Sequence, residues 1–148
     1  MSSGYDFERF VVAQEAGDLY SCAIDELRSG NKVSHWMWFV FPQLAGLGRS
    51  TTSRRYAISS LAEAKAYLNH RVLGPRLIEC ARVICESDAV SAETIFGPLD
   101  AQKLRSSMTL FLRAQPNETL FAAVIDRYFE GQPDRATDEL LAHASEGN

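Results

Sequence analysis

Residues 117–131, NETLFAAVIDRYFEG, decide the fold class of this chain. Asn117 suits the N-cap of a helix, and Gly131 suits the position just past its end. The apolar side chains between them recur at intervals of three and four residues, which places them on one face of an α-helix. They are Leu120, Phe121, Val124, Ile125 and Tyr128. The stretch therefore predicts an amphipathic helix with one buried face.

The same period recurs along most of the chain, separated by helix start and stop residues. Ser60-Leu-Ala-Glu63 is a capping box. Gly74-Pro75 opens another helix, since proline at the first helical position sacrifices no hydrogen bond. Further N-caps are expected at Asp6, Asp18, Ser91, Asp100 and Asp134. We predict an all-α fold for residues 1–148, a compact single-domain bundle of about six to eight helices. Its core should span about residues 6–142, with a frayed tail at 143–148.

One stretch, residues 34–50, SHWMWFVFPQLAGLGRS, breaks the helical pattern. Both tryptophans and two of the eight phenylalanines fall between Trp36 and Phe41. Residues 38–41 resemble a strand, but an isolated strand cannot make a sheet. We expect an irregular segment or short turn that plugs the core, lines a ligand cleft, or does both. In a cleft, the indole N–H groups and His35 would be the polar groups that bond to a ligand.

Charge distribution indicates the sign of a ligand. The net charge of −4 argues against general binding to nucleic acid or to an acidic membrane. Residues 49–76 carry six basic residues and one acid, a sum of +5, so the rest of the chain sums to −9. A basic patch on an acidic protein suits a compact anion. Arg49, Ser50 and Arg54 supply donors for a phosphate or carboxylate. The alternative is a solvated basic face.

A second unusual stretch is residues 100–111, DAQKLRSSMTLF. A helix interior seldom carries several serines and threonines, because they compete for backbone hydrogen bonds. The serines either let another helix pack closely or line a pocket. If this stretch and residues 34–55 form one site, they must be neighbours. Trp36 or Trp38 would then stack on a ring. Arg49, Ser50 and Arg54 would hold its phosphate, and Lys103, Arg105 and Ser106 would close the far side.

These blocks resemble a known family. SHWMWFVFPQLAGLG, the step Tyr56-Ala57-Ile58 and IFGPLDAQKLRSSMTLF are similar to signature blocks of the bacterial family of unknown function DUF1810. Some of its members are labelled calpastatin, an inhibitor that is long, disordered and repetitive and therefore similar in name alone. The resemblance runs collinearly from about Phe7 to Leu141. It implies a compact all-helical, bacterial, cytoplasmic protein, and it implies no activity or catalytic residues.

Several chemistries find little support in the residues. The three histidines form no HExxH motif and the cysteines no CxxC pair, so we expect no metal and no cofactor. A serine hydrolase would need an exposed nucleophile elbow, which the sequence lacks. Cys22, Cys80 and Cys85 lie among apolar residues, and we expect them to be buried, unpaired thiols. This pattern, the lack of a long apolar run and an N-terminus unlike a signal peptide favour a cytoplasmic protein without a membrane span.

Two functional hypotheses remain. The first is a site for an anionic, nucleotide- or ADP-ribose-like small molecule between residues 34–55 and the helix at 100–113. If that site is catalytic, an N-glycosidase-type cleavage would need a carboxylate or an imidazole near the sugar, and Asp100 and His35 are the candidates. The second is a protein–protein interaction module, or a homodimer, that uses the aromatic segment without catalysis.

Overall fold

The structure, a computed structural model, describes residues 4–146. Its helices are α1 (Glu8–Glu15), the 3-10 turn η1 (Ala16–Asp18), α2 (Leu19–Ser29), α3 (Met37–Val40), α4 (Thr51–Arg55), α5 (Leu61–Asn69), α6 (Leu73–Glu86), α7 (Ala92–Ala114), α8 (Thr119–Tyr128) and α9 (Arg135–Glu146). Among these residues no strand forms, and the one β-type pairing is an isolated bridge between Leu44 and Ile58. The all-α prediction is confirmed. Seven helices of the described chain (α1, α2 and α5 to α9) have eight or more residues, within the predicted number.

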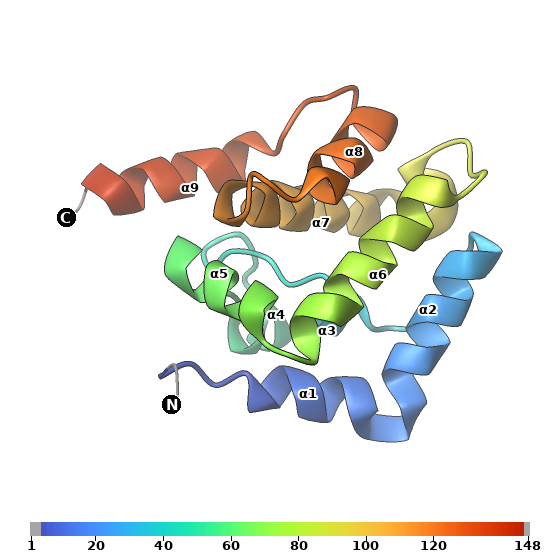
Figure 1. Cartoon of the computed structure of the whole chain (residues 1–148), viewed down its shortest axis with the longest axis horizontal. Coiled ribbons are helices and arrows are strands. Elements are labelled where there is room, and N and C mark those ends of the chain that lie inside the picture. Colours follow the sequence, from blue (N-terminus) through green and yellow to red (C-terminus); the bar gives the residue numbers. More distant parts are fainter. Residues whose placement is uncertain (1–3, 147–148) are drawn as a thin grey trace.

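Helix α7 is the centre of the molecule. It contacts α5 on one side and α8 and α9 on the other, while α6 bridges α5 and α8 (Figure 1). Helices α1 and α2 pack at the end of the molecule opposite α9. From Ser106 to Phe111 every side chain of α7 is buried. This part of α7 therefore lies inside the bundle, where Ser106 bonds to Asp134 and Thr109 to Arg105 O and Asp134 N.

The aromatic segment forms one helical turn, α3, and residues 38–41 are not a strand. This agrees with the expected irregular segment or short turn, and its large apolar residues face the core from a turn and not from a sheet. Trp36 is 1% exposed and Phe41 fully buried, each packing near Phe96 of α7. The segment is therefore part of the core.

Helix starts follow the serine caps better than the aspartate caps. Ser60, Ser91 and Ser50 each accept a hydrogen bond from the backbone N–H three residues on, as an N-cap does. Asp134 also caps its helix. Asp6 and Asn117 are not N-caps, because the N-cap positions of α1 and α8 are Phe7 and Glu118. Asp18 is the N-cap residue of α2 as predicted, but its side chain makes no capping hydrogen bond.

Asp100 is not an N-cap either. The start of α7 is interrupted at Gly97, whose φ of 79° and ψ of 162° lie outside the helical region. Pro98 follows and begins the longer part of the helix, in the position where a missing N–H costs nothing. Asp100 thus sits inside the first turn after the break, and its carboxylate is free to face other elements.

The cysteine prediction holds in part. Cys80 is buried and Cys85 half-buried, but Cys22 is exposed, so its predicted burial was wrong. It precedes the buried residues Ala23 and Ile24 on α2 and points away from their face. All three thiols are free, and burial raises the pKa of Cys80 to about 12. Residues 143–146, expected to fray, continue α9, and 147–148 lie outside the described residues. No described helix is both long and apolar enough to cross a bilayer.

Candidate functional site

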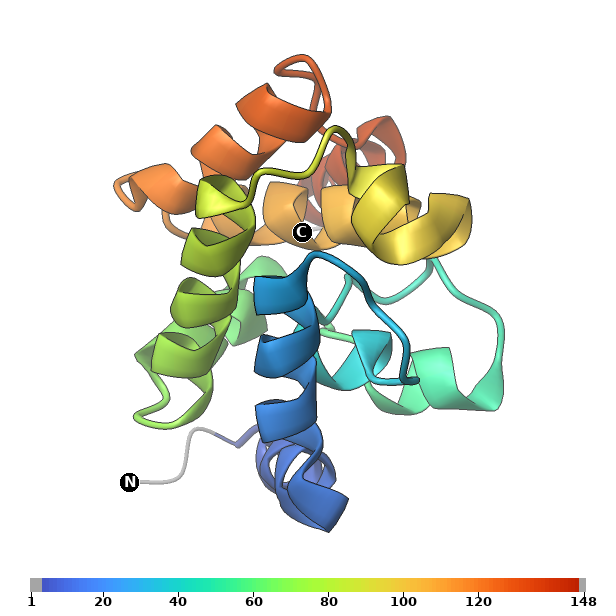
Figure 2. The same cartoon turned by 90° about the vertical axis from the view of Figure 1, so that its right-hand side faces the viewer.

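A cavity of about 380 Å³ opens between the aromatic segment, α4 and α7, and we call it the Trp38 cleft. The connection from α2 to α4 passes beside the first half of α7, which brings together residues far apart in sequence (Figure 2). The cleft is lined by Lys32, His35, Trp36, Met37, Trp38, Phe39, Ser50, Thr52, Asp100 and Lys103. It therefore joins the two unusual stretches of the sequence.

The charged part of the cleft is a lysine pair, Lys32 and Lys103, held by Asp100. The Nζ atoms of Lys32 and Lys103 lie 2.8 Å and 3.0 Å from the two carboxylate oxygens of Asp100. Burial alone would raise the pKa of Asp100, but the hydrogen bonds from both lysines outweigh it and lower that pKa. The carboxylate is thus ionised, and two cations face one anion. This excess of positive charge suits an anionic ligand.

Each ammonium of the lysine pair also lies over an indole ring. Lys103 Nζ is 4.6 Å from the ring centroid of Trp38, and Lys32 Nζ is 5.0 Å from that of Trp36. These cation–π contacts fix the lysines against rigid surfaces. The side chain of Lys32 is only 7% exposed and that of Lys103 is 28% exposed. The two cations are therefore prearranged and do not swing freely in solvent.

Glu26 of α2 holds the loop that carries Lys32 and His35. Its carboxylate accepts hydrogen bonds from Val33 N, Ser34 N, Ser34 Oγ and Trp36 Nε1, at 2.6 to 2.9 Å. Desolvation would raise the pKa of Glu26, but these bonds outweigh it and lower the pKa from 4.5 to about 2. The same carboxylate satisfies the buried indole and shapes one wall of the cleft.

This arrangement predicts a pH-dependent contribution of Glu26 to stability. The pKa is lower in the folded state, so the ionised group stabilises the fold above about pH 4.5, and that stabilisation is lost as the pH falls towards 2. We expect Glu26→Gln to be less stable than wild type at pH 7, with the gap narrowing steadily as the pH falls to 3. Urea denaturation across that range measures the gap. A pH-independent gap would show that the charge of Glu26 does not matter.

The α4 side of the cleft supplies hydroxyl groups. Ser50 caps α4 by accepting a bond from Ser53 N, and both Ser50 and Thr52 line the cleft. A Cβ atom on Gly48 would lie 2.5 Å from Ser53 Cβ, so only glycine allows the loop to close onto α4 here. Arg49 and Arg54 are exposed beside these residues and are not part of the cleft lining.

The α7 side divides the predicted residues between two places. Lys103 lies in the cleft, whereas Arg105 donates from Nε to Gln132 O and its guanidinium lies 5.7 Å from the ring of Phe129. Residues two apart on a helix point in nearly opposite directions, so one helix cannot aim both at one ligand. Ser106 is buried and donates to Asp134. The cleft thus contains His35, Trp36, Trp38, Ser50, Asp100 and Lys103 of the predicted set.

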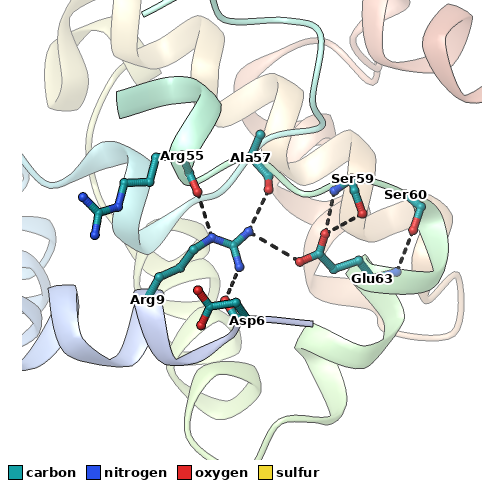
Figure 3. Close-up of polar contacts among 7 residues, drawn as sticks. All are labelled: Asp6, Arg9, Arg55, Ala57, Ser59, Ser60 and Glu63. Atoms are coloured by element: carbon teal, nitrogen blue, oxygen red, sulfur yellow. Dashed lines mark hydrogen bonds and ion pairs between the residues drawn. The ribbon is translucent and has the colours of Figure 1, made fainter. Parts of the chain in front are cut away.

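The position of α4 depends on Arg9 of α1. Its guanidinium donates to the backbone oxygens of Asp6, Arg55 and Ala57 and pairs with Glu63 at 3.5 Å (Figure 3). Glu63 Oε1 in turn accepts bonds from Ser59 N and Oγ, both at 2.7 Å. Because these bonds reach the last residue of α4 and the start of α5, Arg9 fixes the side of the cleft that carries the hydroxyls.

Comparison with known proteins gives the family. The family described as "Protein of unknown function (DUF1810)" matches residues 4–141, which is nearly the whole chain. The chain belongs to the DUF1810 family. Comparison with curated proteins gives no match. The resemblance inferred from the aromatic block and the α7 block is therefore confirmed.

A solved structure shares this DUF1810 fold. The conserved hypothetical protein Rv1873 from Mycobacterium tuberculosis is 52% identical, with a TM-score of 0.90. The match covers 93% of this chain and 97% of that one. The description of DUF1810 assigns no activity.

Sequence reasoning missed Lys32, which lines the Trp38 cleft, and Glu26, which holds the loop that forms one of its walls. Lys32 lies in a short polar connection without a motif, and its role depends on Asp100, which is 68 positions further on. Glu26 lies on an ordinary amphipathic helix, and its four acceptor contacts arise only when the loop folds back. Neither residue has a local signal. Residues 49–76 did have a local signal, their excess of basic residues. They contribute Ser50 and Thr52 to the lining of the Trp38 cleft, but none of their basic residues.

Proposed function

We propose that the Trp38 cleft binds a small anionic, nucleotide-like molecule and that the lysine pair holds its phosphate. The observation that carries this proposal is the pair of ammonium groups fixed by one shared carboxylate beside an open cavity. Hydrogen bonds from charged donors to phosphate are roughly twice as strong as neutral ones. The hydroxyls of Ser50 and Thr52, which also line the cleft, offer further donors.

Aromatic surface supports a ligand that also carries a planar ring. Trp38 is half-buried and lines the cleft, so part of its indole can contact a ring of the ligand. His35 is exposed at the same place and supplies an additional donor or acceptor. A nucleotide or an ADP-ribose-like compound combines such a ring with phosphate. Inorganic phosphate alone would leave the aromatic wall unused.

Asp100 serves this proposal as a positioning residue. Both of its carboxylate oxygens are engaged by the lysine pair, at 2.8 Å and 3.0 Å. A group held in this way stays ionised and sets the spacing of the two cations, whereas a general acid would need to carry a proton. Of the two candidates for catalysis in the sequence, His35 is therefore the one whose side chain stays available for a proton transfer.

The aromatic patch that motivated the protein-interaction hypothesis is mostly buried. That hypothesis required an exposed patch of Trp36, Trp38, Phe39 and Phe41. Trp36 and Phe41 are buried in the core, and the other two are only partly exposed beside the cleft. Among the described residues, the large hydrophobic side chains that are exposed are Val12, Val33, Val90 and Leu99, and none of them belongs to the aromatic segment.

A thermal-shift comparison of matched compounds tests the proposal. The melting temperature of the protein should rise with AMP, GMP, CMP or UMP, because a ligand that binds the folded state stabilises it. The corresponding nucleosides, which lack the phosphate, should raise it far less. If nucleosides and nucleotides at equal concentration shift the melting temperature equally, or neither shifts it, the lysine pair is not a phosphate site.

A further inference from the structure

A second cavity adjoins the Trp38 cleft, and we call it the Gln43 cavity. Its volume is about 380 Å³, and it shares Trp38 and Lys103 with the first. The two cavities therefore meet at the same indole and ammonium. Leu47 and Leu99 supply apolar lining, and Leu99 is 79% exposed. An apolar side chain as exposed as this gains from being covered.

Among the described residues that line the Gln43 cavity, one buried side-chain polar atom has no hydrogen-bond partner. Gln102 Nε2 and Ser106 Oγ both donate to the carboxylate of Asp134, at 2.9 Å and 3.0 Å. Gln43 is only 6% exposed, and its Nε2 atom has no hydrogen-bond partner in the described structure. Buried amide groups almost always have partners, so an unmatched one beside a cavity points to a missing acceptor.

We propose that the Gln43 cavity is the subsite for the planar base of the ligand, and that Gln43 Nε2 donates to a carbonyl oxygen or ring nitrogen on the edge of that base. This inference rests on the proposed phosphate site. Lys103 borders both cavities, so a single molecule can reach both, with its phosphate at the lysine pair and its base beyond Trp38.

The residues around the Gln43 cavity fit a nucleobase better than an aliphatic group. A flat ring would contact the indole of Trp38 and the side chains of Leu47 and Leu99 with its faces. Its edge would meet the amide. Sites that pair a hydrogen-bonding group with one on the ligand discriminate strongly, because an analogue without that group leaves the buried partner unmatched. An aliphatic chain would leave Gln43 Nε2 without a hydrogen-bond acceptor.

The test compares AMP with ribose 5-phosphate, which has the phosphate and no base, by isothermal titration calorimetry. Wild type should bind AMP at least about tenfold more tightly. Gln43→Leu, which keeps the side-chain size and removes the amide, should lose about a factor of ten for AMP and leave ribose 5-phosphate unchanged. Ala136→Phe, at an exposed position that lines the same cavity, should also remove the preference for AMP by filling the space.

The outcomes separate this inference from the proposed phosphate site. If both compounds bind wild type equally, or if Gln43→Leu and Ala136→Phe keep the full preference for AMP, the base subsite is wrong while the phosphate site stands. If neither compound binds wild type, both proposals fail. Because Ala136 is exposed, its variant should fold even if a change at the buried Gln43 disturbs the core.

Discussion

Replacing Arg9 with alanine is expected to lower the free energy of unfolding by about 3–5 kcal/mol, because the change leaves a buried carboxylate without its cation. The Glu63 side chain is 4% exposed and that of Arg9 is 14% exposed, so water cannot readily replace the guanidinium. Three backbone oxygens, those of Asp6, Arg55 and Ala57, would lose their donor as well. For a chain of this length the melting temperature should fall by roughly 10 °C.

Two further variants make the Arg9 result specific. Arg9→Lys keeps the charge but cannot reach several oxygens at once with a compact ammonium, so it should recover only part of the loss. Arg82→Ala removes an exposed arginine whose ion pair with Glu79 lies on the surface of α6, and it should change stability by less than about 1 kcal/mol. A loss no larger for Arg9→Ala than for Arg82→Ala would show that the network in Figure 3 does not hold α4 and α5 in place.

Local sequence correctly predicted a helix where one face of the stretch was clearly apolar. The predicted helix after Asn117 is α8, and Phe121, Val124 and Ile125 are its buried face. The capping box at Ser60 is present as predicted. The predicted cap failed at Asp6, where Phe7 is the N-cap residue, because several neighbouring residues can begin a helix and tertiary contacts choose among them. Secondary structure was thus predictable in kind, and helix starts were predictable at Ser60, Ser91 and Asp134 but not at Asp6 or Asn117.

The aromatic segment shows why the site was only partly predictable. Composition indicated that residues 34–50 plug the core, line a cleft or do both, and in the structure the segment does both. Trp36 is buried with its indole bonded to Glu26, whereas Trp38 lines both cavities. No local pattern distinguishes two tryptophans separated by one residue, since their surroundings come from α2 and α7. Arg105, in contrast, could have been separated from Lys103 by helical geometry alone.

Removing the lysine pair is expected to have the largest effect on ligand binding. Each ammonium would make a charge-assisted hydrogen bond to the phosphate, and loss of one such bond typically costs about 1.5–3 kcal/mol, which is a factor of about 10 to 100 in affinity. Lys103→Met keeps the length of the side chain and much of its contact with Trp38, while Asp100 keeps Lys32 as a partner. The double variant Lys32→Met/Lys103→Met should lose more affinity than either single change.

Calorimetric titration of AMP into wild type, Lys103→Met and Arg82→Met tests the central claim most directly. Arg82→Met is the matched control, because it removes one positive charge from a side chain that is 48% exposed on α6 and lines neither cavity. We predict that Lys103→Met weakens AMP binding at least about tenfold while Arg82→Met binds as wild type does. Equal affinities in all three proteins, or equal losses in both variants, would contradict a phosphate site at the lysine pair.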